Sequence, residues 1–137
     1  MSQYCTVRTE FRNLQALLHA LSETGGWVLE NIEVHEGGQN LIGYRGDTRP
    51  EIAHVIIRKG FVGDASNDIG FVKTEEGSYA AIISQYDKTR YNQQWLNNLK
   101  KNYAFHSIKI EQENRGRTVS REILDKGRQR ITVNGYR

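Results

Sequence analysis

Four side chains, those of Tyr44, Arg45, Tyr103 and His106, could bind a ligand or transfer a proton. Tyr103 and His106 are three positions apart, so a helix would place them one turn apart on the same face. Such a pair can hold a polar ligand or move a proton. The alternative is that Tyr103 packs in the core and His106 forms a hydrogen bond at its edge. We expect Tyr103 to be structural, Arg45 to be available for contacts, and His106 to lie at the boundary between the two roles.

Other kinds of catalytic or metal site lack their sequence patterns. The single cysteine, Cys5, allows neither an internal disulfide nor a zinc site built from several thiolates. Neither of the glycine-rich patterns that cradle phosphates occurs. The histidines do not have the spacing of zinc ligands; they are His19, His35, His54 and His106. We therefore predict no catalytic residue, no metal, no cofactor and no enzymatic activity.

Composition indicates one domain, residues 1–137, in a reducing cytoplasm. A chain of this length typically forms one domain. The first residues lack the basic start and apolar stretch of a secretory signal. No apolar run approaches the ~20 residues that a membrane-spanning helix needs, so we expect no membrane contact.

Charge is distributed unevenly along the chain. Residues 1–85 contain 7 Lys/Arg and 11 Asp/Glu, a net charge of −4, whereas residues 86–137 contain 12 and 5, a net charge of +7. Clustered basic residues can bind nucleic acid. Here acidic residues are interspersed among them, which is also typical of a solvated surface.

Hydrophobic spacing predicts an opening strand and helix. Residues 4–9 are rich in β-branched and aromatic types, as in a strand. Asn13 can cap a helix with leucines at 14, 17, 18 and 21, and Gly25-Gly26 can end it. Strands are then expected at 27–34, 41–44, 52–57, 69–73 and 79–84, with a hairpin turn at 36–39 and another at 75–78.

From Asn92 the apolar period becomes helical and predicts a long helix to about Glu113, although residues 104–110 could instead form a strand. A last hairpin is predicted to pair residues 119–123 with 130–134. The predicted fold class is α+β: a mainly antiparallel sheet with two helices packed on one face, in the order β-α-(several β)-α-β-β.

Several short motifs resemble those of one known family. Residues 43–48 read Gly-Tyr-Arg-Gly-Asp-Thr, residues 67–71 read Asn-Asp-Ile-Gly-Phe, and residues 103–106 read Tyr-Ala-Phe-His. They resemble the G-Y-R-G-Q-T, Y-D-I-G-F and Y-A-Y-H motifs of the hypothetical chloroplast reading frame thirty-five family of cyanobacteria and algal plastids. Asn67 replaces the family's tyrosine, and residues 59–66 look inserted, as in a diverged member carried by a virus of cyanobacteria.

The resemblance implies a compartment and a kind of partner. It implies a cyanobacterial cytosol, a plastid stroma or an infected host cell, and a protein partner such as an AAA-type ATPase. We therefore favour a non-enzymatic protein-interaction or adaptor module. The first alternative is a nucleic-acid-binding domain that uses the basic residues 86–137. The second is an enzyme or small-ligand binder with a site near Tyr44, Arg45, Tyr103 and His106.

Overall fold

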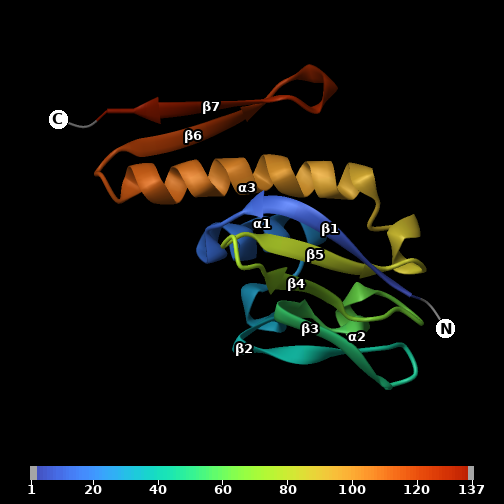
Figure 1. Ribbon diagram of the computed structural model, residues 1–137. Helices are drawn as coiled ribbons and strands as arrows, with labels where there is room; N and C mark the ends of the chain where they lie inside the picture. Colours follow the sequence, from blue (N-terminus) through green and yellow to red (C-terminus); the bar gives the residue numbers. More distant parts are fainter. Residues whose placement is uncertain (1–2, 136–137) are drawn as a thin grey trace.

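The computed structural model describes residues 3–135 and has the predicted α+β architecture, with a mainly antiparallel sheet (Figure 1). The strands are β1 (Tyr4–Phe11), β2 (Ile32–Ile42), β3 (Thr48–Ile57), β4 (Ile69–Lys73), β5 (Tyr79–Ser84), β6 (Thr118–Ile123) and β7 (Gln129–Asn134). The α-helices are α1 (Leu14–Gly25), α2 (Lys59–Val62) and α3 (Gln93–Glu113). Short 3-10 turns occur at Leu29–Asn31, Asp87–Thr89 and Asp125–Gly127.

The strands form two separate sheets. Within residues 3–135, five strands pair antiparallel in the order β1-β5-β4-β3-β2, and β6 pairs only with β7. Strand β2 is therefore one edge of the main sheet, while β1 is the other edge and lies next to α3 (Figure 1). The predicted last hairpin is confirmed, but it stands on the far side of α3 from the main sheet.

Helix α1 covers one face of the main sheet. The Asn13 side chain accepts a hydrogen bond from the backbone N–H of Ala16 at 3.0 Å, as predicted for the cap. Leu17 and Leu21 are fully buried and pack in the same core as the sheet residues Val55 and Phe71. The predicted leucine stripe therefore anchors the helix to the sheet.

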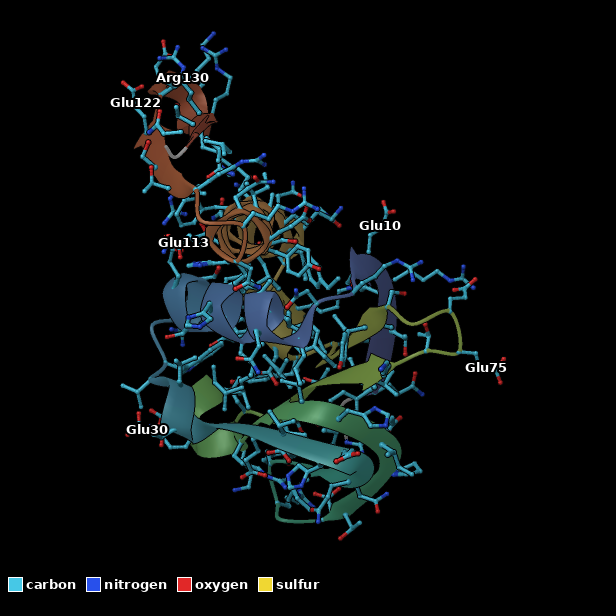
Figure 2. The ribbon with its side chains drawn as sticks, turned by 90° about the vertical axis from the view of Figure 1, so that its left-hand side faces the viewer. Glu10, Glu30, Glu75, Glu113, Glu122 and Arg130 are labelled. Carbon is cyan, nitrogen blue, oxygen red and sulfur yellow. The ribbon has the colours of Figure 1, made fainter. Side chains whose placement is uncertain are left out.

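Helix α3 packs on α1 and runs along the β1 edge (Figure 2). Asn92 caps it by accepting a hydrogen bond from the backbone N–H of Trp95 at 3.1 Å, and Leu96 and Leu99 are buried. Residues 104–110 are helical, so the strand alternative was wrong. None of the described helices has the length and apolar character needed to span a membrane.

The other face of the sheet carries a second, smaller core. Leu41, Ala53, Ile56 and Ile82 are buried together there. Gly70 is needed at this point, because a Cβ atom built on it would lie 2.5 Å from the Cβ of Ala53. The two cores make the main sheet a rigid support for the loops at its ends.

The predicted hairpin turn at residues 36–39 was wrong. Strand β2 runs through these residues, and the turn occurs at 43–47 instead. Gly38, with φ +82°, lies where the register between β2 and β3 shifts, as in a β-bulge. The glycine pair therefore bends a strand rather than ending it. Residues 27–31, predicted as strand, form a loop and a 3-10 turn.

Candidate interaction site

The four predicted site residues lie in two separate places. Tyr44 and Arg45 belong to the β2–β3 turn, whereas Tyr103 and His106 lie on α3. The turn and the helix are at opposite edges of the main sheet (Figure 1). A single site built from all four side chains is therefore not formed.

Tyr103 connects α3 to the junction between β1 and α1. Its hydroxyl accepts hydrogen bonds from the backbone N–H groups of Arg12 and Asn13, both at 2.9 Å. Its ring contacts that of Phe11, with the ring centroids 4.6 Å apart. These contacts match the structural role expected for Tyr103.

His106 belongs to a polar cluster that joins three elements. Its Nε2 atom lies 2.8 Å from Glu23 on α1, and the Arg121 guanidinium on β6 lies 2.8 Å from the other oxygen of Glu23. Burial lowers the pKa of His106, against the opposing effect of Glu23. Burial tends to raise the pKa of Glu23, but hydrogen bonds from His106 and Arg121 outweigh it and hold that pKa below its usual value.

A cleft of about 730 Å³ lies between β1, the β4–β5 turn and α3. The pairing of β1 with β5 shifts register here, between Val7 and Phe11. Tyr103 lines the cleft, and the predicted residues Tyr44, Arg45 and His106 do not. The charged side chains around it are Arg8, Glu10, Arg12, Glu76 and Lys100.

The β2–β3 turn is held by backbone and side-chain hydrogen bonds. The N–H of Gly43 donates to the carbonyl of Asp47 at 2.8 Å, and Gly46 has φ +81°, which favours glycine. The N–H of Tyr44 donates to the side-chain oxygen of Asn67 at 3.0 Å. This last hydrogen bond connects the motif at 43–48 to the motif at 67–71.

Beneath the turn lies a buried polar network. The Asn67 side chain donates to the Ser84 hydroxyl at 3.0 Å, and that hydroxyl donates to the Asp87 carboxylate at 2.8 Å. Asp68, also buried, accepts from the N–H of Ile42 at 2.7 Å and from the Arg58 guanidinium at 2.8 Å. A satisfied buried network of this kind holds its surroundings rigid. Sequence reasoning noted the Asn67-Asp68 motif but did not identify this role.

The side chains above this network face solvent. Tyr44 and Arg45 are exposed and contact each other, with the Arg45 Nε donating to the Tyr44 hydroxyl at 2.8 Å. Tyr86 is 56% exposed and follows β5. Residues 43–47, 63–68 and 85–90 lie together at one end of the sheet (Figure 1), and we call them the loop end.

The basic excess of the final third is partly neutralised by acidic neighbours. The ion pairs are Lys109–Glu113, Arg115–Glu111, Arg121–Glu23, Arg128–Asp125 and Arg130–Glu122. Each pairs a cation of the basic third with a carboxylate of the same chain. The Lys/Arg residues of this region therefore do not form an uninterrupted basic surface.

Sequence comparison places the chain in a family. The profile of the family described as "Protein of unknown function (DUF1257)" matches residues 29–132, which include the loop end, α3 and most of the last hairpin. No curated protein matches the chain, and no solved structure does either. The match covers well over half of the chain, and so the protein belongs to the DUF1257 family.

Proposed function

We propose that this protein is a non-enzymatic protein-interaction or adaptor module that contacts its partner through the loop end. One observation carries the proposal: the backbone of the β2–β3 turn is fixed by buried polar groups, yet the Tyr44 and Arg45 side chains project into solvent. Among the described residues, the polar contacts of these two side chains are with each other. Tyrosine and arginine are among the residues that contribute most to protein–protein binding energy.

The loop end supports protein binding better than nucleic-acid binding. The loop end contains three basic residues, but it also contains four acidic ones, namely Asp47, Asp64, Asp68 and Asp87. Nucleic-acid surfaces combine aromatic stacking with a continuous positive charge. In the loop end, acidic residues interrupt the positive charge beside the exposed aromatic residues.

The motifs at 43–48, 67–71 and 103–106 suggest which partner to test first. They resemble the hypothetical chloroplast reading frame thirty-five family, which points to an AAA-type ATPase in a cyanobacterial-type cytosol. A preformed turn binds with little loss of conformational entropy, because its backbone is already ordered. An adaptor of this kind needs no chemistry of its own.

Affinity purification from a cyanobacterial lysate tests the proposal. Wild-type protein is compared with the double variant Tyr44→Ala/Arg45→Ala and with Arg115→Ala, which removes an exposed arginine just after α3. We expect the double variant to lose the partner while its melting temperature stays unchanged, and Arg115→Ala to retain it. Equal recovery of the partner with all three proteins would contradict the proposal.

The small-ligand alternative is tested at the cleft beside Tyr103. Its volume of about 730 Å³ is in the range of small-molecule sites. In the described residues, neither Arg8 nor Lys100 forms an ion pair, so either could bind an anionic ligand. A thermal-shift screen with carboxylate and phosphate compounds tests this, and Lys100→Gln should abolish any stabilisation that is found.

A further inference from the structure

The hairpin arm, residues 118–134, has one apolar face that is only partly covered. Pairing of Val119 with Val133 and of Arg121 with Ile131 places these side chains on the same face, because side chains alternate along a strand. Ile123 follows on that face. Val119 and Ile131 are half-buried, but Val133 is 41% and Ile123 is 67% exposed. The opposite face is polar, with Ser120, Glu122, Arg130 and Thr132.

Strand β7 also has a free edge. Strand β6 lies against α3, where the Arg121 guanidinium sits 3.9 Å from the centre of the Phe105 ring, and β7 lies beyond it. Figure 2 shows Glu122 and Arg130 pointing away from the rest of the molecule. In the described part of the chain, β7 pairs only with β6. A two-stranded sheet is marginally stable alone, and an added strand would stabilise it.

The charge of the arm indicates which strand would be added. Residues 118–134 contain four Lys/Arg and two Asp/Glu. The pairs Arg128–Asp125 and Arg130–Glu122 are exposed and therefore weak, so each arginine can exchange its own carboxylate for one of a partner. Two positively charged arms would repel each other, which disfavours a second copy of this chain. The arm has no aromatic residue on which a base could stack.

We propose that the hairpin arm binds an extended acidic segment of a partner protein, which pairs as a third strand with the free edge of β7. Main-chain hydrogen bonds to an exposed sheet edge provide affinity, and alternate side chains provide specificity. Apolar residues of the segment would lie beside Ile131 and Val133, and its carboxylates would meet Arg130 on the other face. This surface is distinct from the loop end and does not depend on the function proposed there.

A fluorescein-labelled peptide of eight residues that alternates glutamate with valine tests the proposal by fluorescence anisotropy on the full chain. We expect it to bind, to bind more weakly as salt increases, and to bind at least tenfold more tightly than the same peptide with lysine in place of glutamate. Val133→Ser should weaken binding roughly tenfold. Val34→Ser, on the free edge of β2 and 46% exposed, is the matched control and should change affinity less than about twofold.

Several results would overturn the proposal. These are the absence of binding, equal binding of the acidic and basic peptides, or equal weakening by Val133→Ser and Val34→Ser. A labelled single-stranded oligonucleotide that binds the arm more tightly than the acidic peptide would assign it to nucleic acid instead. The Tyr44→Ala/Arg45→Ala variant should bind the peptide normally, so failure at the loop end and failure at the arm can be told apart.

Discussion

Individual residues of the shared motifs have different roles. Asp68 and Gly70, in the motif at 67–71, are buried, and the structure explains both residue types. The Asp68 carboxylate accepts hydrogen bonds from three groups. At Gly70, neighbouring side chains leave no room for a Cβ atom. Tyr44 and Arg45, in the motif at 43–48, have no such reason. The sequence placed all four in motifs, but burial distinguishes the structural pair from the pair proposed to bind.

The Asp68 carboxylate connects the ends of β2 and β3 to the loop end. Asp68→Ala should lower the free energy of unfolding by about 3 kcal/mol, because it leaves the N–H groups of Ile42 and Lys59 and part of Arg58 without an acceptor. Urea denaturation measures the change. Asp64→Ala, in the same loop but exposed, should change it by less than about 0.5 kcal/mol. Similar losses for both variants would show that Asp68 has no special role.

Stability should depend on pH through His106 and Glu23. Because burial lowers the pKa of His106 from its ordinary value of 6.5, the unfolded chain takes up this proton at higher pH than the folded chain. The contribution of His106 to the free energy of unfolding is therefore fully present above pH 6.5 and is lost as the pH falls from 6.5 toward the folded-state pKa. The lowered pKa of Glu23 causes a further loss of stability at still lower pH, where this carboxylate takes up a proton. His106→Gln should flatten the dependence just below pH 6.5 in urea denaturation; an unchanged slope would contradict this.

At the scale of elements, the sequence predicted those with a strong period and a cap. Helices α1 and α3 begin directly after Asn13 and Asn92, as expected, and the β6–β7 hairpin is where the pattern placed it. The error at residues 36–39 arose because glycine pairs occur both in turns and in β-bulges, and only the partner strand decides between them. The loop end could not be predicted, because its network joins residues from four segments.

Gly70 tests the packing of the second core. Gly70→Ala should lower the free energy of unfolding by roughly 1–3 kcal/mol, because the new methyl group would overlap Ala53 and Leu41. Adding Ala53→Gly should restore part of the loss. Gly60→Ala is the control, since a Cβ atom there has no neighbour within 4 Å. Full tolerance of Gly70→Ala, measured by urea denaturation, would mean that the β2–β3 hairpin does not pack on this face.

At the scale of the whole molecule, the two candidate contact surfaces are separate from each other. The loop end lies at one end of the main sheet, and the hairpin arm lies beyond α3 (Figure 1). Arg121 and Gln129 of the arm contact Glu23 on α1 and the Lys101 carbonyl on α3. The Lys101 ammonium group donates to the carbonyl of Gly127 in the arm. If both proposals hold, the loop end and the arm could contact different segments of one partner or two partners.

Hydrogen–deuterium exchange of the complex with the captured partner tests the central claim most directly, because it locates the contact without any substitution. Binding through the loop end predicts slower exchange at residues 43–47, 63–68 and 85–90, with the centres of β4 and β5 unchanged. The amide of Tyr44 is held by Asn67 in the free protein, so additional protection is expected mainly at Arg45 and Tyr86. Protection confined to α3, or to the cleft beside Tyr103, would contradict the account.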